Sequence, residues 1–228
     1  SLGLETYGGL AERIIDRNST IPIARAQEFT TARDGQTGLV VHVVQGERER
    51  VADCRSLARF ELKGIPPMVA GAARIEVTFR VDADGILEVS AVEQQSGARS
   101  EVVVKPAFGL DELDITDMLK ASYEFAAEDM VARKLAEAGV DAEALLEGLR
   151  AALAQDGDLL DSDEAQTLQQ EMARLEQVLQ QTDVDAIREH TEKLGRASET
   201  FAARRMDRSI QTALRGISVG QLDAESAE

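Results

Sequence analysis

The amino-acid sequence predicts a β + α fold, in which an antiparallel β-sandwich is followed by an α-helical bundle. Turn-forming residues divide residues 1–109 into segments of about eight residues, several of which alternate apolar and polar side chains. After residue 109, glycine and proline become rare, and the strong helix formers Ala, Leu, Glu, Gln and Arg dominate. We therefore expect a sandwich over 1–109, helices over 110–215 and a flexible tail over 216–228.

The clearest β signal is a hairpin near the end of the first half. In RIEVTFRV, residues 74–81, apolar and charged or hydroxylated side chains alternate, and the same alternation returns in ILEVSAV, residues 86–92. The DADG segment between them has the composition of a tight turn. With the other turn-bounded segments, this hairpin indicates about eight strands, enough for a sandwich.

The segment TGLVVHVVQGER, residues 37–48, has apolar side chains on both faces of one predicted strand. Leu39, Val41 and Val43 point to one side, and Val40 and Val44 point to the other. One interpretation is that both faces are buried inside the domain. The alternative is that Leu39 and Val41 line a channel that receives an extended polypeptide.

The helical half carries a regular apolar stripe. Leu168, Met172, Leu175 and Leu179 are spaced by four, three and four residues, and a second set continues at intervals of seven with Ile187, Leu194 and Phe201. Breaks at 154–158 and 180–185 indicate separate helices, the last of which Thr182 or Asp183 can cap. The stripe favours a bundle core over a dimerising coiled coil, because its seams are short.

Charge and composition exclude several classes of function. The net charge is −17, of which residues 1–109 contribute −2 and residues 110–228 contribute −15. Such an acidic chain repels phosphate backbones, so we expect no nucleic-acid partner.

The sequence also predicts no membrane span, because no apolar run approaches the roughly 20 residues needed to span a bilayer. A single cysteine fits a reducing, cytoplasmic compartment, and the start without Met suggests a piece of a longer protein.

The sequence offers no catalytic or metal-binding constellation. His42 and His190 lie in different halves, and neither has ligands at metal-site spacing. No glycine-rich loop ends in the Lys-Ser/Thr pair that holds phosphates, and Cys54 has no obvious base beside it. We therefore expect a binding segment rather than an enzyme, with no catalytic residue, metal or cofactor of its own.

A series of ungapped motifs resembles the substrate-binding domain of the DnaK-type chaperones, the seventy-kilodalton heat-shock protein (Hsp70) family. These motifs, in order, are SLGLET, RNSTIP, QEFTTARDGQ, VVQGERE, LARFELKGIPP and IEVTFRVDADGILEVSAV. The segment FAARRMDRSI, residues 201–210, and the absence of the arginine that the family has in its lid contact resemble the branch called HscA, which serves iron–sulfur cluster assembly.

This resemblance implies a sandwich that holds an extended client segment under a helical lid. By position, the residues that line the channel and its central pocket would be Leu4, Phe29, Leu39, Val41 and Ile75. Thr6 and Thr30 would lie beside the client backbone, Gln36 near its end, and Tyr7 and Ala32 would arch over it. Val40 and Val44 would then belong to the sandwich interior.

Two positions depart from the family pattern. Tyr7 stands where the family frequently has Met, which implies a stiffer arch. Glu143 matches a lid carboxylate, but Ala70 stands where its arginine partner is expected, and Arg74 is the nearest arginine in the chain beyond it. The resemblance therefore implies a more loosely closed lid.

The resemblance also implies partners that lie outside this segment. ATP with Mg²⁺ would bind a separate nucleotide-binding domain of the parent protein, whose hydrolysis an HscB-like J-domain co-chaperone would stimulate. The expected client is the cluster scaffold protein IscU, through a Leu-Pro-Pro-Val-Lys-like segment. The alternative is a generalist chaperone that accepts many apolar peptides.

Overall fold

The structure is a computed structural model that describes residues 1–104 and 112–215, and it confirms the predicted β + α fold. The predicted tail over 216–228 lies outside the described residues. The strands are β1 (Leu2–Thr6), β2 (Leu10–Ile15), β3 (Ile23–Phe29), β4 (Gly38–Gln45), β5 (Arg55–Lys63), β6 (Ile75–Val81), β7 (Leu87–Glu93) and β8 (Arg99–Val104). The α-helices are α1 (Glu112–Glu124), α2 (Ala126–Asp156), α3 (Ser162–Leu179) and α4 (Val184–Arg215), with short 3-10 turns at Val51–Asp53 and Gly157–Leu159.

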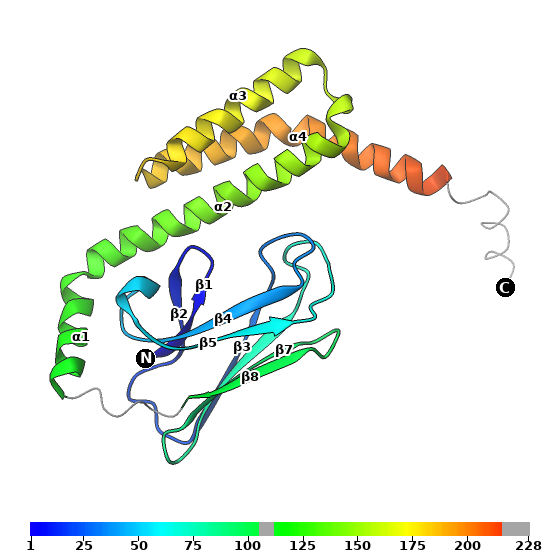
Figure 1. The fold of residues 1–228 in the computed structure, drawn as a ribbon. Coiled ribbons are helices and arrows are strands. Elements are labelled where there is room, and N and C mark those ends of the chain that lie inside the picture. The colour runs from blue at the N-terminus through cyan, green and yellow to red at the C-terminus, as the bar shows by residue number, and fades with distance from the viewer. Residues whose placement is uncertain (105–111, 216–228) are drawn as a thin grey trace, which may run out of the picture. The chain divides into compact units, whose positions relative to one another are not determined.

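The strands form two four-stranded antiparallel sheets. The first has the order β2-β1-β4-β5 and the second the order β3-β6-β7-β8, and Figure 1 shows the two as stacked layers. The predicted hairpin is β6 and β7, whose last pair is Val81 with Leu87. In its turn the Asp82 carboxylate accepts hydrogen bonds from the backbone N–H groups of Asp84 and Ile86, at 2.9 and 2.8 Å.

The core lies between the two sheets. It is one buried apolar cluster to which β4 contributes Val41 and Val43, β6 contributes Ile75, Val77 and Phe79, and other strands contribute the rest. These positions alternate along each strand, as the pattern of the sequence predicts. The two sheets are therefore held together by every second side chain of each strand, because alternate side chains of a strand point to the same face.

The structure of β4 corrects the prediction that Val40 and Val44 belong to the sandwich interior. Val41 and Val43 are 2% and 0% exposed and Leu39 packs against the same cluster, whereas Val40 is 54% exposed. Val40 is therefore not in the interior, because it points away from the face that packs on the second sheet. Val44 lies on the same face of β4 as Val40, so it does not join the inter-sheet cluster, although it is buried.

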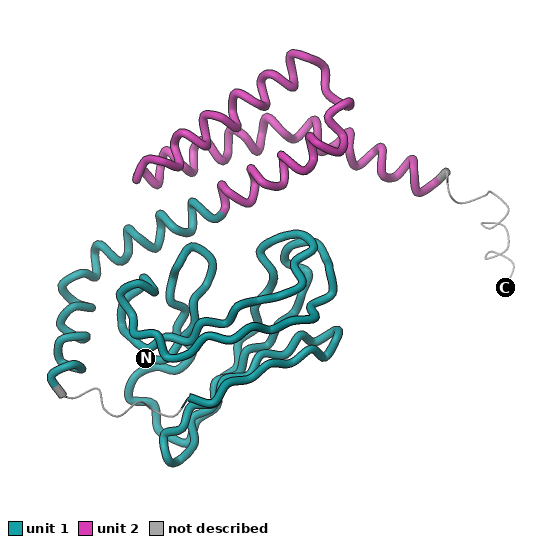
Figure 2. The backbone as a smooth tube through the Cα atoms, viewed as in Figure 1, with its two compact units in different colours: residues 1–140 teal, residues 141–228 magenta. Residues whose placement is uncertain are grey.

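The chain divides into two compact units, shown in Figure 2. The first comprises residues 1–140 and thus holds both sheets, α1 and the first part of α2. The second comprises residues 141–228, of which 141–215 are described. The helical segment predicted to begin at residue 110 therefore contributes to both units.

Charged contacts attach the start of α2 to the sandwich within the first unit. The Arg48 guanidinium donates two hydrogen bonds to the Asp129 carboxylate, at 2.7 and 2.9 Å, and lies 4.5 Å from the centre of the Phe125 ring, at the break between α1 and α2. One turn further along, Arg133 pairs with Glu12 at 3.3 Å. Asp129 is only 4% exposed, and its hydrogen bonds from Arg48 hold its pKa below the ordinary value.

The second unit has the bundle core that the sequence predicts. The buried apolar side chains on α3 and α4 are Leu168, Met172, Leu175, Ile187, Leu194 and Phe201, whereas Leu179 is only half-buried. Asp161 and Glu164 form a reciprocal capping box at the start of α3. Of the two predicted caps for α4, Asp183 is the one that accepts backbone hydrogen bonds, from Asp185 and Ala186.

The arginines of FAARRMDRSI turn toward the bundle and close the connection between α2 and α3. Arg204 donates to both carboxylate oxygens of Glu164, at 2.6 and 2.7 Å, and to the Leu159 carbonyl at 2.8 Å. Arg205 pairs with Asp156 at 2.7 Å.

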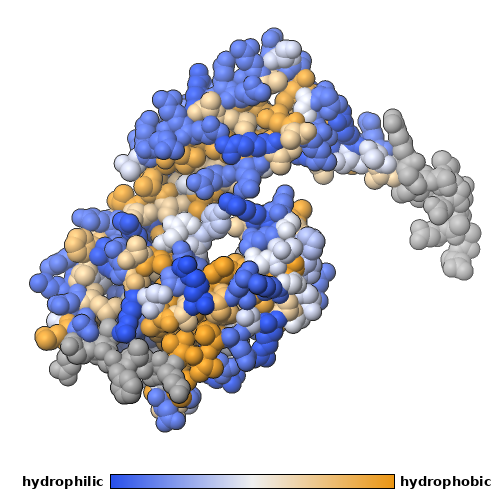
Figure 3. Space-filling view, viewed as in Figure 1, coloured by the Kyte–Doolittle hydropathy of each residue, from blue (hydrophilic) through white to orange (hydrophobic). Residues whose placement is uncertain are grey.

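The visible face of this second unit is dominated by hydrophilic side chains (Figure 3). Among the described helices, none combines the length and apolar character that crossing a membrane requires.

The Arg48–Asp129 pair predicts a measurable loss of stability on removing its negative charge. Asp129→Asn removes the hydrogen-bonded counter-ion of the largely buried Arg48 guanidinium and leaves it only the longer contact with Asp53, at 3.6 Å, so we expect the free energy of unfolding to fall by about 3 kcal/mol at pH 7. Urea denaturation followed by circular dichroism measures it. The control is Glu101→Gln, which breaks the exposed pair with Arg99 and should cost less than about 1 kcal/mol; equal losses would contradict the prediction.

The Arg48–Asp129 pair also predicts how the difference in unfolding free energy between the wild-type chain and Asp129→Asn depends on pH. Because the pKa of Asp129 is lower in the folded protein than in the unfolded chain, the pair stabilises the fold above the unfolded pKa of about 4. This contribution is lost as the pH falls through the folded pKa. The stabilities of the wild-type chain and Asp129→Asn should therefore converge in acid, and a gap that stays constant with pH would contradict this origin.

Candidate functional site

A pocket of about 700 Å³ opens in the first unit where β1 and β4 separate. The two strands pair from Leu2 with Gln45 to Leu4 with Val43, and the pocket lies beyond this last pair. Its walls come from β1, β3, β4, the start of β6 and the loops between them. The lining residues are Leu4, Glu5, Thr6, Tyr7, Glu28, Phe29, Thr30, Ala32, Gln36, Leu39, Val40, Val41, Gly71, Ala72, Ala73, Arg74 and Val77.

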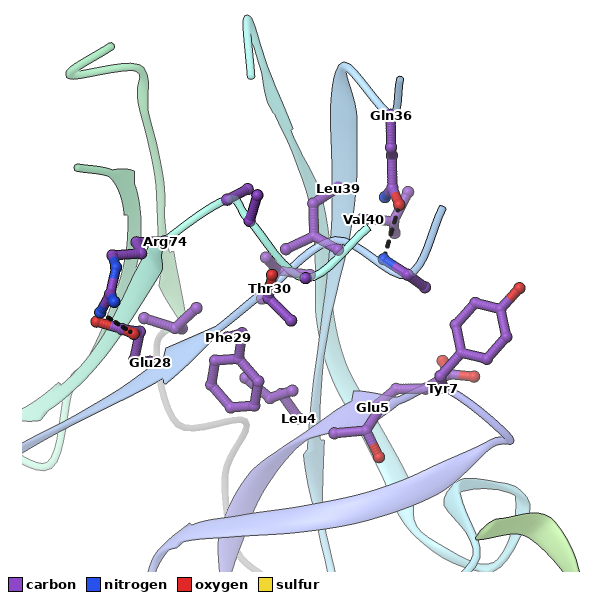
Figure 4. Close-up of a pocket in the computed structure, with 17 residues that line it drawn as sticks. Leu4, Glu5, Tyr7, Glu28, Phe29, Thr30, Gln36, Leu39, Val40 and Arg74 are labelled. Carbon is purple, nitrogen blue, oxygen red and sulfur yellow. Dashed lines mark hydrogen bonds and ion pairs between the residues drawn. The ribbon is translucent and has the colours of Figure 1, made fainter. Parts of the chain in front are cut away.

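The floor of the pocket is one end of the sandwich core. Leu4, Val41 and Val77 are buried members of the inter-sheet cluster, and the half-buried Phe29 and Leu39 pack against it. Figure 4 shows Leu4, Phe29 and Leu39 gathered at the centre of the hollow, with Thr30 beside them. An apolar side chain that enters here would continue the packing of the core, which is the chemistry of an apolar-residue pocket.

The rim has different chemistry on its two sides. On one side stand Tyr7, Val40 and Gln36, and on the other Arg74 pairs with Glu28 at 3.0 Å (Figure 4). The Gln36 side chain is already engaged, since its amide oxygen accepts from the backbone of Ala32 at 3.1 Å and its nitrogen donates to a neighbouring carbonyl.

Backbone contacts hold the two loops beside the pocket together. The N–H of Gly35 donates to the Met68 carbonyl at 2.7 Å, and the N–H of Gly71 donates to the Thr31 carbonyl at 2.9 Å. The Asp34 carboxylate accepts from the N–H of Ala70 at 2.7 Å. The Thr37 carbonyl also accepts from the N–H groups of Gly64 and Ile65, each at 3.1 Å, so five hydrogen bonds join loops 31–37 and 64–73.

A polar network lies on the opposite face of the first sheet. Glu5 Oε2 is 2.7 Å from Nδ1 of the buried His42, whose Nε2 is 2.8 Å from the Ser56 hydroxyl. Arg59 approaches the Glu5 carboxylate at 3.7 Å. This network links β1, β4 and β5 side by side and accounts for His42, which lies on a strand face as the sequence predicts. Within residues 1–104 and 112–215, no group of three His, Cys, Asp or Glu residues is arranged to hold a metal ion.

The structure brings most of the sequence-predicted residues to this one pocket. Nine of the ten line it: Leu4, Thr6, Tyr7, Phe29, Thr30, Ala32, Gln36, Leu39 and Val41. Ile75 is not among the lining residues; it is fully buried in the core, and its cross-strand partner is Phe29. Val77, two residues further on the same face, reaches the pocket instead.

Sequence reasoning missed part of the wall, which Glu5, Glu28, Val40, Gly71, Ala72, Ala73, Arg74 and Val77 complete. Residues 71–73 lie in a loop without periodicity, so no pattern could indicate which way they face. The interior position expected for Val40 is wrong, although the alternation along β4 alone places it opposite Leu39 and Val41.

The predicted lid contact stays a prediction. Glu143 is an exposed residue of α2 in the second unit. Ala70 lies in the loop beside the pocket, where its backbone bonds to Asp34. Arg74, the nearest arginine in sequence, is engaged with Glu28.

Comparison with known proteins supplies the family. A family model described as Hsp70 protein matches residues 1–207, most of the chain. The chain belongs to the Hsp70 family. This confirms the family resemblance that the ungapped motifs indicated.

The similar curated proteins carry the name of one branch of that family. The chaperone protein HscA homolog of Methylobacillus flagellatus is 62% identical over 224 residues, which cover 98% of this chain and 36% of the relative. The HscA homologs of Shewanella loihica and of Neisseria meningitidis serogroup B are each 60% identical over 222 residues, or 97% of this chain and 36% of each relative. This Hsp70-family chain therefore spans little more than a third of the length of these relatives.

Proposed function

We propose that this chain is the client-holding part of an Hsp70-type chaperone, and that the pocket between β1 and β4 receives an extended polypeptide. The observation that carries the proposal is the apolar floor of Leu4, Phe29, Leu39 and Val41, which lies at the point where two paired strands separate. An extended segment entering there can form backbone hydrogen bonds while one of its apolar side chains fills the hollow.

Energetic considerations favour reversible holding. Burying one Leu or Val side chain of a client contributes roughly 1.5–3 kcal/mol, whereas a micromolar complex requires about 8 kcal/mol. One or two buried side chains and several backbone hydrogen bonds, less the cost of ordering the client, reach this range without much excess. Such an affinity suits a chaperone, because the client must also be released.

The specific role that we propose is iron–sulfur cluster assembly in the cytoplasm. The client would be an IscU-type scaffold protein, bound through a Leu-Pro-Pro-Val-Lys-like segment whose prolines favour the extended form in advance. Release would be driven by ATP hydrolysis in a nucleotide-binding domain of the parent protein, stimulated by an HscB-like J-domain co-chaperone. The similarity to HscA homologs supports this role.

A titration with two labelled peptides tests the proposal. One contains Leu-Pro-Pro-Val-Lys and the other is a leucine-rich segment of equal length, and fluorescence anisotropy reports binding. A specialised chaperone should bind the proline-containing peptide about tenfold or more tightly, whereas similar affinities would indicate a generalist. Absence of binding to either peptide would refute the client-holding role itself.

The arch residue Tyr7 predicts a change in selectivity. Tyr7→Met replaces a rigid ring by a flexible thioether that adapts to different shapes, so we expect the spread of affinities across a panel of apolar peptides to narrow. The measurement is the dissociation constant for each peptide. An unchanged ranking and spread would contradict the idea that the ring restricts the choice of client.

The absence of an arginine at Ala70 predicts that Glu143 contributes little to retention of the client. Without a bidentate charge-assisted contact, Glu143→Ala should leave the peptide dissociation rate within about a factor of two, the change that a weak exposed charge contact produces. Stopped-flow displacement of a labelled peptide measures this rate. A clearly faster release would show that Glu143 has another partner that holds the lid.

A further inference from the structure

Three side chains on the outer face of the first sheet are joined by two short polar contacts. Glu5 Oε2 lies 2.7 Å from His42 Nδ1, and His42 Nε2 lies 2.8 Å from the Ser56 hydroxyl. The three residues come from β1, β4 and β5, neighbouring strands of that sheet, so their spacing along the chain does not indicate that they meet. A carboxylate, an imidazole and a hydroxyl in this order are the arrangement in which histidine acts as a general base toward serine.

The contacts of His42 determine which ring nitrogen carries the proton. An ionised carboxylate has no hydrogen to donate, so the close contact with Glu5 is favourable only when Nδ1 carries the proton. In the neutral ring Nε2 is then an acceptor, and the Ser56 hydroxyl donates to it. Arg59 Nη2 lies 3.2 Å from Nδ1 but cannot donate to a protonated nitrogen, and its charge instead faces the Glu5 carboxylate at 3.7 Å. Glu5 is therefore the positioning residue that directs the lone pair of His42 toward Ser56.

The base and the hydroxyl differ in their access to water as this chemistry requires. His42 is only 8% exposed, so packing as well as hydrogen bonding fixes its ring. Ser56 is exposed, so a reagent in solution can reach its oxygen. The other histidine of the chain, His190, has a buried Nδ1 that makes no hydrogen bond to the described residues, and it therefore has no carboxylate that orients it through this nitrogen.

A cavity of about 610 Å³ lies beside this group within the first unit. Its wall on the sheet includes Glu5, His42 and Arg59, and its apolar wall comes from one face of α2, with Ala132, Leu135 and Ala136. His42 belongs both to this wall and to the contact with Ser56. The cavity thus offers room for a small apolar group close to the hydroxyl.

We propose that Ser56 is a nucleophilic serine that accepts a small apolar acyl group from an activated carboxylic ester, with His42 as its general base. The Ser56 oxygen attacks the carbonyl carbon of the ester, and its proton passes to Nε2 of His42. When the tetrahedral intermediate collapses, the bond between this carbon and the leaving oxygen breaks, and the proton on Nε2 passes to the leaving group. The products are acylated Ser56 and the free alcohol, so the ester is the only co-reactant. This modification site does not depend on the proposed holding of a client.

The experiment uses p-nitrophenyl butyrate in weakly alkaline buffer. Release of p-nitrophenolate gives the rate of acylation, and mass spectrometry of proteolytic fragments identifies the acylated residue. We expect the butyryl group on Ser56, and Ser56→Ala should remove this modification and the fast phase of release. The matched control is Ser96→Ala, because Ser96 is an exposed serine whose hydroxyl accepts from the N–H of Ala98 and has no histidine partner in the described structure. This control should keep the wild-type rate.

Two further variants test the roles of the base and of its positioning residue. His42→Gln should slow acylation of Ser56 about a hundredfold. Glu5→Gln should slow it about tenfold or more, because the amide can donate to Nδ1 and thereby favour the ring form that carries its proton on Nε2. Nitrogen chemical shifts of the His42 ring, measured by NMR, should report this change of proton position, which a merely structural role of Glu5 would not produce. Thermal unfolding curves verify that each variant folds.

Each other outcome overturns the inference. If Ser56 is acylated no faster than Ser96, or if the butyryl group is found on His42 or on amines but not on Ser56, then Ser56 is not the nucleophile. If a folded His42→Gln variant acylates Ser56 at the wild-type rate, His42 is not the general base. If His42→Gln does not fold, Glu5→Gln decides, since an unchanged rate with an unchanged ring signal would contradict the proposed arrangement.

Discussion

The end of the pairing between β1 and β4 is the constraint on which the rest of the site depends. Beyond Leu4 and Val43 the two strands separate, yet the apolar alternation of β4 continues through Val41 and Leu39. These side chains extend the core past the last β1–β4 pair, where Val41 is still buried but Leu39 is only half-buried. Apolar surface left in this way is unfavourable in water, so an extended polypeptide that shields it gains free energy from the same effect that stabilises the sandwich.

Electrostatic contacts have the complementary role of organising the helices. Arg48 ties the start of α2 to the sandwich through Asp129, and Arg204 and Arg205 close the α2–α3 connection through Glu164 and Asp156. A half of the chain with a net charge of −15 needs such inward-facing cations, because its carboxylates would otherwise repel one another. In this protein, apolar contacts define the pocket and the bundle core, while paired charges fix where helices begin and join.

The sequence predicted the parts of the fold that periodicity controls. The β6–β7 hairpin and the apolar stripe through Leu168 and Leu194 follow from spacing, and local chemistry narrowed the cap of α4 to Thr182 or Asp183, of which the structure shows Asp183. Alternation also provided the correct face for Leu39 and Val41. The expectation that Val40 and Val44 belong to the sandwich interior misplaced Val40, because a strand with apolar side chains on both faces does not reveal which face is covered.

Most of the candidate site was predictable only through the family motifs. They placed Leu4, Phe29 and Gln36, which are far apart in sequence, in one pocket, whereas periodicity cannot bring distant strands together. The Glu28–Arg74 pair and residues 71–73 escaped both kinds of reasoning. Their positions depend on how a loop without repeating pattern folds against its neighbour, and this is a tertiary property that no local rule encodes.

The five hydrogen bonds that join loops 31–37 and 64–73 have a kinetic consequence. Without these bonds each loop would move independently of the other, and a client held as proposed could leave the pocket stepwise from one side. Cross-linked by Gly35, Asp34 and Gly71, the two loops share their motions, so one cannot swing outward without straining or breaking contacts to the other. For a client held as proposed, escape would require the two loops to open together, so its residence time would depend on how rarely that opening occurs.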